Sequence, residues 1–328
     1  MTPEYRRQPL VSIVIPTVNQ IELVEKCVVS ILKSKPSVLC NQEIIVVDDG
    51  SPPELQRDLR RRLRPYPVRL LLKEKNTGFA ATVNMGAARS KGDYLCLVNS
   101  DVLFPQKYWL DPLLREARKP RTGVVGARLL YPDGRIQHGG VIYLPAQRTF
   151  DHEYRYRPGN YVPALRRGEA LAVTGALMLV NKGLWERMGG MDERFFIALE
   201  DVDFSLRVWE EGWRVIYAGD VMAVHHEGLT RGRGPADKNP FWFAKERESI
   251  ERFSRKWRGR FAPFRVTGGA GSRREDDGGR SLSRVQALRW QKIAAGRKRT
   301  VNSKYGVSRD ESTLCQLGDT GVSGPLCL

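Results

Sequence analysis

The first hundred residues alternate between short apolar runs and longer segments with helical periodicity. The apolar runs have the length of buried strands, and they cover residues 11–15, 44–47, 68–72 and 93–98. Between them, residues 22–33 have helical periodicity, residues 54–64 are interpreted as a polar, arginine-rich helix closed by Pro65, and residues 79–89 as a helix of small residues. Strands that alternate with helices are typical of βαβ units, so this part of the chain predicts a mostly parallel sheet flanked by helices.

The pattern is less regular after residue 102. We predict strands at 123–130, 135–143, 171–180, 213–217 and 221–225, and helices at 182–188, 200–211 and 241–257. Residues 148–168 are rich in Arg, Tyr, Pro and Gly, which indicates a long loop of the kind that often carries function. The periodicity ends near residue 259, so residues 259–328 are expected to form a basic, poorly ordered tail.

Composition adds a class of partner to this picture. The chain has 328 residues and a formal net charge of +17, which favours anionic partners such as nucleotides, phospholipid head groups or nucleic acid. The longest apolar run, residues 170–180, is too short to cross a bilayer, and the N-terminus lacks the apolar segment of a signal peptide. The five cysteines form no CxxC pair, and their odd number favours a reducing compartment. We therefore expect a cytoplasmic protein.

Acidic residues follow two of the predicted strands directly. The strand at 44–47 ends in Asp48 and Asp49, and the strand at 93–98 ends in Asn99, Ser100 and Asp101. In open α/β sheets, ligands bind beyond the carboxyl ends of the strands. A third acidic cluster opens the helix predicted at 200–211 and contains Glu200, Asp201 and Asp203. Together these clusters predict a site for a metal ion, a sugar hydroxyl or a nucleobase.

Some polar residues near these clusters also have local explanations. We interpret Ser51 as the cap of the following helix, a common use of serine. Asp203 is expected to pair with Arg207 four residues on, because it cannot share the helical face of Asp201. Asn76 and Gly78 precede a helix N-terminus, which is a natural site for an anion.

The motifs occur in a characteristic order. They read Val-Ser-Ile-Val-Ile-Pro-Thr (11–17), Val-Val-Asp-Asp-Gly-Ser (46–51), Asn-Thr-Gly-Phe (76–79) with Asn84 and Gly86, Leu-Val-Asn-Ser-Asp (97–101), Gly-Ala (175–176), Gly-Gly-Met-Asp-Glu-Arg-Phe-Phe (189–196), Glu-Asp-Val-Asp (200–203) with Arg207, and His225. This series closely resembles glycosyltransferase family 2, in particular its rhamnosyltransferase-like branch, over about residues 9–258. The resemblance implies a GT-A fold, with a nucleotide-binding half at 9–101 and a smaller acceptor-binding half at 102–258.

The resemblance also implies roles for individual residues. Asp201 corresponds to the catalytic base, and Asp101 with His225 corresponds to the ligands of a divalent cation, Mg²⁺ or Mn²⁺. Asn99 stands where the family has the first Asp of its Asp-x-Asp motif, and an amide is a weaker metal ligand than a carboxylate. The positions that match the nucleotide-sugar site are Pro16, Thr17, Asp48, Asn76, Gly78, Asn99, Ser100 and Glu200.

The implied function is an inverting transfer of a sugar from a nucleotide-diphosphate sugar to a saccharide or lipid-linked acceptor, as in the biosynthesis of cell-surface polysaccharides. A basic stripe on the last helix indicates possible peripheral contact with an anionic membrane. It consists of Lys245, Arg247, Arg252, Arg255, Lys256 and Arg258. The sequence leaves the donor sugar, the nucleobase and the acceptor open.

Two other classes of protein are alternatives. A nucleotidyltransferase on a similar sheet would need a loop rich in Gly and Lys or Arg after the first strand, and residues 16–20 contain none of these. A basic nucleic-acid-binding protein would need Lys and Arg with aromatic residues in a known module, and none is recognisable. We therefore expect no specific nucleic-acid partner.

Overall fold

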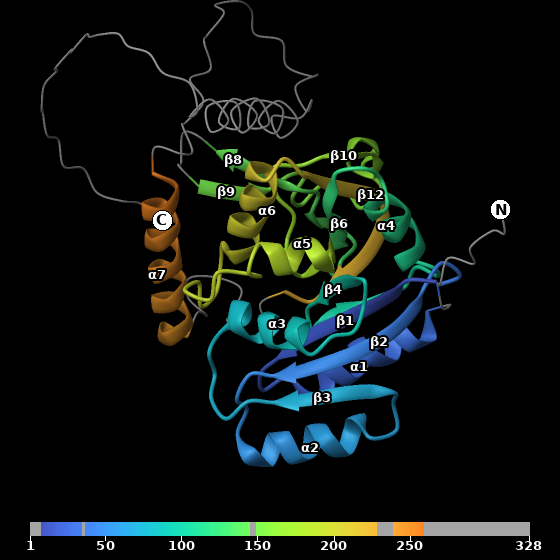
Figure 1. Ribbon diagram of the computed structural model, residues 1–328, viewed down its shortest axis with the longest axis vertical. Coiled ribbons are helices and arrows are strands. Elements are labelled where there is room, and N and C mark those ends of the chain that lie inside the picture. Colours follow the sequence, from blue (N-terminus) through green and yellow to red (C-terminus); the bar gives the residue numbers. More distant parts are fainter. Residues whose placement is uncertain (1–7, 35–36, 145–148, 228–238, 259–328) are drawn as a thin grey trace, which may run out of the picture.

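The computed structural model describes residues 8–34, 37–144, 149–227 and 239–258 (Figure 1). Ten strands of this described part form one mixed sheet: β1 (Leu10–Thr17), β2 (Asn41–Asp48), β3 (Val68–Leu72), β4 (Tyr94–Val98), β5 (Val102–Leu103), β6 (Thr122–Leu130), β7 (Ile136–His138), β10 (Arg167–Glu169), β11 (Leu177–Asn181) and β12 (Arg214–His225). The order is β10-β12-β6-β11-β4-β1-β2-β3, with β5 paired to β12 and β7 to β6. A separate hairpin consists of β8 (Val141–Leu144) and β9 (Thr149–His152).

Parallel pairing dominates the first half of the chain, as predicted. β1 pairs in parallel with both β2 and β4, and β2 pairs in parallel with β3. β11 then joins β4 to β6 by antiparallel pairing, while β6 and β12 are parallel. The sheet is therefore continuous from the first half of the chain into the second, and the predicted α/β class is confirmed.

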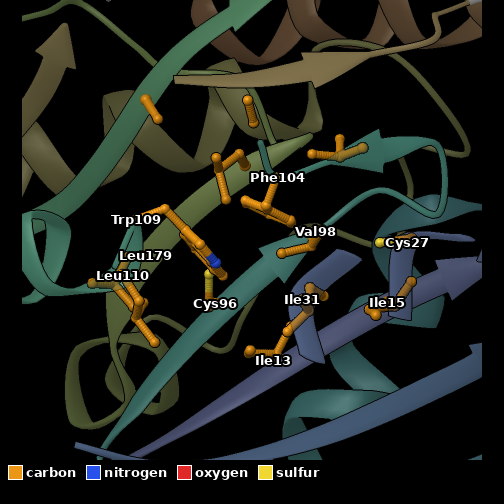
Figure 2. Packing of buried hydrophobic residues seen from close by; sticks show 14 of the residues in the cluster. Ile13, Ile15, Cys27, Ile31, Cys96, Val98, Phe104, Trp109, Leu110 and Leu179 are labelled. Carbon is orange, nitrogen blue, oxygen red and sulfur yellow. The ribbon is translucent and has the colours of Figure 1, made fainter. Parts of the chain in front are cut away.

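Two hydrophobic cores cover the two faces of the sheet. The helices are α1 (Ile21–Lys33), α2 (Pro53–Leu63), α3 (Phe79–Ala88), α4 (Leu110–Ala117), α5 (Lys182–Arg187), α6 (Glu200–Glu210) and α7 (Pro240–Trp257). Side chains of α1, α2 and α4 pack on one face, and those of α3, α5, α6 and α7 pack on the other. Successive residues of a strand point to opposite faces, so Ile13 and Ile15 enter the first core and Val14 enters the second. Figure 2 shows the first core, where Ile13 of β1 lies near Ile31 of α1.

Several segments differ from the sequence prediction, among them the strand expected at 135–143, which is two strands, β7 and β8. The predicted loop at 148–168 contains β9, β10 and a 3₁₀ turn at Val162–Leu165. The two strands predicted at 213–217 and 221–225 are a single strand, β12, whose register shifts between Ala218 and Met222. β11 begins at Leu177 rather than at residue 171, and α4 was absent from the prediction. The predicted tail at 259–328 lies outside the described residues.

The pairing of β12 with β5 positions two of the candidate site residues. His225 is opposite Val102 in the ladder, and the backbone N–H of His226 donates to the Asp101 carbonyl at 3.0 Å. Because Asp101 directly precedes β5, this pairing places the end of β12 beside the end of β4. Two segments more than a hundred residues apart in sequence therefore meet at one edge of the sheet.

Candidate active site

One cavity of about 340 Å³ collects most of the predicted site residues. Those that line it are Pro16, Thr17, Gly78, Asn99, Ser100, Asp101, Glu200, Asp201 and His225. They come from the ends of β1, β4 and β12 and from the start of α3 and α6. The convergence that the sequence required is therefore present. Asp48 and Asn76 do not line this cavity.

Asp48 and Asp49 lie in different environments although they are adjacent. The Asp48 side chain is fully buried, and its carboxylate accepts hydrogen bonds from the Ser51 N–H, the Ser51 hydroxyl and the Gln56 amide. Asp49 lines the cavity and accepts from the Thr77 N–H and the Gly78 N–H, each at 2.9 Å, and from Lys73 at 2.7 Å. Asp48 thus shapes the turn after β2, whereas Asp49 holds the loop before α3.

Two local interpretations of this region need correction. Ser51 does not cap α2, because its hydroxyl donates to Asp48 and accepts from the Asn19 N–H. The Asn76 side chain accepts from the Gly78 N–H at 3.0 Å, and the Phe79 N–H donates to the Phe196 carbonyl at 2.9 Å. The first N–H groups of α3 are therefore already bound within the protein, which weakens the predicted anion site there.

Glycine is required at position 78, where the loop before α3 passes close to the backbone of Phe196. The φ of Gly78 is +92°, in the left-handed region, and a Cβ at this position would overlap the backbone of Phe196. Glycine alone avoids both the steric strain of positive φ and this overlap. The close approach brings the start of α3 against the segment that leads into α6.

Asp101, His225 and Asn99 form a polar cluster at the cavity wall. His225 Nε2 lies 3.1 Å from an Asp101 carboxylate oxygen and 3.5 Å from the Asn99 side-chain nitrogen. His225 Nδ1 lies 2.7 Å from the side-chain oxygen of Gln137, which can only accept, so Nδ1 carries a proton, and in the neutral ring Nε2 keeps its lone pair. The buried Asn99 Oδ1 has no hydrogen-bond partner within the described structure.

These donor atoms fit a hard divalent cation. A carboxylate oxygen, an amide oxygen and an imidazole nitrogen are suitable ligands for Mg²⁺ or Mn²⁺. In the neutral ring, the Nε2 lone pair and the nearby Asp101 carboxylate oxygen are both electron-rich, so a cation between them would be favourable. Among the described residues, no three His, Cys, Asp or Glu side chains cluster closely enough to hold a metal alone. Two such side chains would leave coordination positions open for ligand oxygens.

Asp201 is held rigidly at the start of α6. One carboxylate oxygen accepts from the Gly175 N–H at 2.9 Å, and the other accepts from the Val202 N–H at 2.7 Å. Ala198 and Leu199, just before the helix, both have positive φ (72° and 63°). Backbone strain in non-glycine residues costs about 1–3 kcal/mol each and concentrates at functional sites. The strained turn therefore aims Glu200 and Asp201 at the cavity.

The structure confirms the predicted pairing of Asp203 and extends it. Arg207 donates to Asp203 at 3.0 Å, and the same buried carboxylate accepts from Lys256 at 2.9 Å and from the Trp257 indole N–H at 2.9 Å. Asp203 thus joins α6 to α7 rather than facing the cavity. Its role is to attach the helix that carries Asp201.

Sequence analysis missed the part of the cavity that β8, β9 and their neighbours supply. These residues are Gln137, Val141, Phe150, Asp151, His152, Arg155, Glu227 and Trp242. β9 fell within the segment interpreted as a loop, and β8 was merged with β7 in the strand predicted at 135–143. Single His or Arg residues carry no motif. The one available signal was the scarcity of histidine, since the chain has four, and three of them are at or next to this cavity.

The basic stripe predicted on α7 is partly neutralised. Lys256 is occupied by Asp192 and Asp203, Lys245 pairs with Glu248, and Arg247 lies 3.9 Å from Glu251. This helix therefore does not present a continuous cationic face. No helix of the described ranges is long and apolar enough to cross a membrane.

The pH dependence of stability should depend on His138. Burial lowers the pKa of this fully buried side chain well below its usual range, and His152 beside it adds to the effect. The unfolded chain protonates His138 below about pH 6.5, whereas the folded protein keeps it neutral, so acid favours unfolding. We expect the contribution of His138 to be complete above that pH and to be lost as the pH falls below it.

Thermal melts between pH 7.5 and pH 5 check this expectation. As the pH falls, the free energy of unfolding should decrease less in His138→Gln than in the wild type, because glutamine does not titrate. The difference should be up to about 1.4 kcal/mol per pH unit. Parallel pH profiles for the two proteins would contradict the assignment.

Solved structures with the same fold are glycosyltransferases. The mannosyltransferase PcManGT from Pyrobaculum calidifontis, in complex with GDP-Man and Mn²⁺, matches 92% of this chain and 77% of its own, with a TM-score of 0.56 and 17% identity. GalNAc-T7 with UDP, GalNAc and Mn²⁺ matches 67% of this chain and 44% of its own, with a TM-score of 0.54 and 19% identity. These matches show that the fold is GT-A, as predicted.

Sequence relatives agree with this class. An uncharacterized protein, y4gI, of Sinorhizobium fredii is 32% identical over 76% of this chain, and O-antigen biosynthesis protein RfbC of Myxococcus xanthus is 28% identical over 73%. The chain spans only 28% and 19% of their respective lengths. N-acetylglucosaminyl-diphospho-decaprenol L-rhamnosyltransferase of Mycobacterium tuberculosis is 28% identical over 63% of this chain and 75% of its own.

The fold is thus that of the GT-A glycosyltransferases. Two family profiles match the chain, Glycosyl transferase family 2 over residues 12–173 and Glycosyl transferase family group 2 over residues 110–266. The two profiles together span residues 12–266, so the chain belongs to glycosyl transferase family 2. The resemblance inferred from the motifs is therefore confirmed, and neither alternative class is supported.

Proposed function

We propose that this protein transfers a sugar from a nucleotide-diphosphate sugar to a saccharide or lipid-linked acceptor, with inversion at the anomeric carbon. The observation that carries the proposal is the shared cavity of Asp101, Asp201 and His225. An inverting transfer needs a donor site, a group that stabilises the leaving diphosphate and one general base beside the acceptor. Residues that line this cavity are candidates for each of these three roles.

The donor would bind along the ends of β1 and β4. Pro16, Thr17, Asn99 and Ser100 line this part of the cavity, and the buried Thr17 hydroxyl has no hydrogen-bond partner in the described part of the chain. Gly78, which also lines the cavity, allows the loop before α3 to lie against the backbone of Phe196. Because Asp48 is occupied by the turn after β2, we assign it a supporting role, and Asp49 is the carboxylate of that pair that faces the cavity.

Asp101 and His225 would hold a divalent cation, with Asn99 at its side. When bound, the cation supplies positive charge that stabilises the departing nucleoside diphosphate. Gln137 orients His225 by accepting its Nδ1–H, which keeps Nε2 directed at Asp101. The solved neighbours that contain Mn²⁺ support this proposal.

Gln137→Leu should lower the affinity for Mn²⁺ by about 10- to 100-fold, because His225 loses the group that fixes its tautomer. The measurement is the Mn²⁺-dependent rise in melting temperature of the full chain, followed with and without nucleotide. EDTA should abolish transfer, and Mn²⁺ or Mg²⁺ should restore it. Full activity in EDTA, or an unchanged Mn²⁺ titration in the variant, would contradict the cation site.

Asp201 would act as the base. Its carboxylate is fixed by the Gly175 and Val202 N–H groups, yet it remains on the cavity wall, where an acceptor hydroxyl can reach it. As Asp201 takes the proton, the acceptor oxygen attacks the anomeric carbon and the bond to the diphosphate breaks. A single displacement of this kind inverts the anomeric configuration.

The relatives named for O-antigen biosynthesis and for rhamnosyl transfer to a diphospho-decaprenol support a role in cell-surface polysaccharide biosynthesis. A lipid-linked acceptor would place the reaction in the cytoplasm beside a membrane. The test combines the full chain, Mn²⁺, a panel of nucleotide-activated sugars that includes L-rhamnose, and alkyl N-acetylglucosaminide as acceptor. NMR of the product gives the anomeric configuration. Retention of configuration would exclude the single displacement, and transfer with no sugar of the panel would count against this donor and acceptor class.

A further inference from the structure

We propose that His152 binds the acceptor saccharide through its Nε2–H, and that His138 is the positioning residue that fixes His152 in the required tautomer. This inference rests on the proposed transfer to a saccharide acceptor and adds the residue that orients it. His152 belongs to β9, on the hairpin that no motif indicated.

Two hydrogen bonds in series determine which nitrogen of His152 carries the proton. The Thr174 N–H donates to His138 Nε2 at 3.4 Å, so the neutral His138 ring must carry its proton on Nδ1. His138 Nδ1 lies 2.8 Å from His152 Nδ1, so His138 donates and His152 accepts. The neutral His152 ring therefore carries its proton on Nε2. Burial lowers the pKa of both rings, which keeps the pair neutral.

The Nε2–H of His152 is left for a ligand. His152 lines the cavity, and Nε2 has no hydrogen-bond partner among the described residues. Carboxylates of Asp201 and Glu227 lie near enough to influence the ring electrostatically. A neutral N–H donor beside carboxylate acceptors is suited to a group that both donates and accepts, and a sugar hydroxyl is such a group.

His152 and the proposed base, Asp201, are both positioned by one short backbone segment, residues 172–175. Thr174 N–H binds the histidine pair, and the next amide, Gly175 N–H, binds Asp201 at 2.9 Å. The hairpin is registered on the same segment, because Val141 pairs with both His152 and Ala172. The two side chains are therefore positioned together, so an acceptor whose hydroxyl faces Asp201 would present a neighbouring hydroxyl to His152.

The hairpin side of the cavity also suits a sugar ring rather than a diphosphate. Phe150 of β9 lines this side and offers an apolar surface to a saccharide, whereas the proposed cation ligands Asp101 and His225 lie at the ends of β4 and β12. We therefore assign His152 to the acceptor and not to the nucleotide.

Nitrogen-15 NMR of the histidine rings tests the tautomer without any substrate. The chain has four histidines, so the full-length protein labelled at these rings gives few signals. We expect His152 to show a protonated Nε2 in the wild type and in His138→Gln, whose amide can still accept from Thr174 and donate to His152. In His138→Met, which removes both bonds, His152 should show a mixture of tautomers. A wild-type His152 protonated at Nδ1 would overturn the proposal.

Kinetics tests the acceptor role, with the alkyl N-acetylglucosaminide as probe. His152→Phe should raise the acceptor KM about tenfold and change the donor KM less than about twofold, because one hydrogen bond to the acceptor is lost. His138→Met should raise the acceptor KM in the same direction, and His138→Gln should restore it. Nucleotide-sugar binding measured by calorimetry shows whether His152→Phe is folded.

The outcomes separate this inference from the proposed function. An unchanged acceptor KM in His152→Phe, or a raised donor KM instead, overturns the acceptor role while the wild type still transfers sugar. Equal kinetics of the two His138 variants overturns the positioning role. If the wild type transfers no sugar to the probe, the proposed function fails for this acceptor, and the tautomer measurement still decides whether Nε2–H is presented to the cavity.

Discussion

Asp201→Asn is expected to lower the rate of sugar transfer by about a thousandfold, the usual contribution of a general base. Asparagine cannot take a proton from the acceptor hydroxyl. Its side-chain oxygen can still accept from the Gly175 N–H, as Asp201 does at 2.9 Å, and only the bond from the Val202 N–H is lost, so the start of α6 should keep its position. The nucleotide-sugar should therefore bind with nearly unchanged affinity, because the proposed donor residues lie on β1 and β4. Transfer assays and calorimetry on the same preparation measure both quantities.

Asp220→Asn is the matched control. Asp220 undergoes the same change of charge and shape, but it pairs with Arg167 at the surface and does not line the cavity. Surface ion pairs contribute about 0–1 kcal/mol, so this variant should transfer sugar at the wild-type rate. Turnover of Asp201→Asn within a few-fold of the control would remove Asp201 from the role of base.

Asp203→Ala should produce the largest loss of stability, about 3–5 kcal/mol. The Asp203 side chain is fully buried and accepts from Arg207, Lys256 and the Trp257 indole. Removing the carboxylate leaves the largely buried Arg207 without its ion-pair partner and leaves Lys256 with Asp192 alone, and it opens a cavity in the contact between α6 and α7. The melting temperature should fall by roughly 10 °C, measured by differential scanning calorimetry.

Two further variants show whether this loss arises from buried charge. Asp203→Ala combined with Arg207→Met should be more stable than Asp203→Ala alone, because the charge that the first substitution leaves unpaired is gone. Lys245→Met, at the more exposed pair with Glu248, should change stability by less than about 1 kcal/mol. A double variant no better than the single one would mean that lost packing, rather than charge, dominates.

The regular half of the fold could be predicted because each signal was local. β1, β2, β3 and β4 are apolar runs, and α1, α2 and α3 have periodic apolar faces, so burial alone selects their structures. The acidic residues after β2 and β4 could be placed near a site because the carboxyl ends of parallel strands share one edge of a sheet. The same reasoning could not show which of Asp48 and Asp49 faces the cavity. Neighbouring side chains of a strand point to opposite sides, and the sequence does not tell on which side the cavity lies.

The acceptor side could not be predicted in the same way. β8 and β9 pair with each other outside the main sheet. Their polar residues face a cavity rather than bulk water, so the usual alternation of buried apolar and exposed polar residues is blurred. α4 is short and has a proline at its start, which obscures its periodicity. The register shift in β12 made one strand resemble two.

The amino-acid sequence alone determined the class of fold, the family and the stretches that carry polar site residues, because hydrophobic periodicity and motif order are properties of neighbouring positions. Only the tertiary structure decided which carboxylate faces the cavity, which nitrogen of His225 is left beside Asp101, and that His152 stands near Asp201. Those facts depend on pairings between segments far apart in the chain, such as β5 with β12. They also depend on hydrogen bonds to backbone groups such as the Thr174 and Gly175 amides. The directions of these amides are set only when the whole sheet has formed.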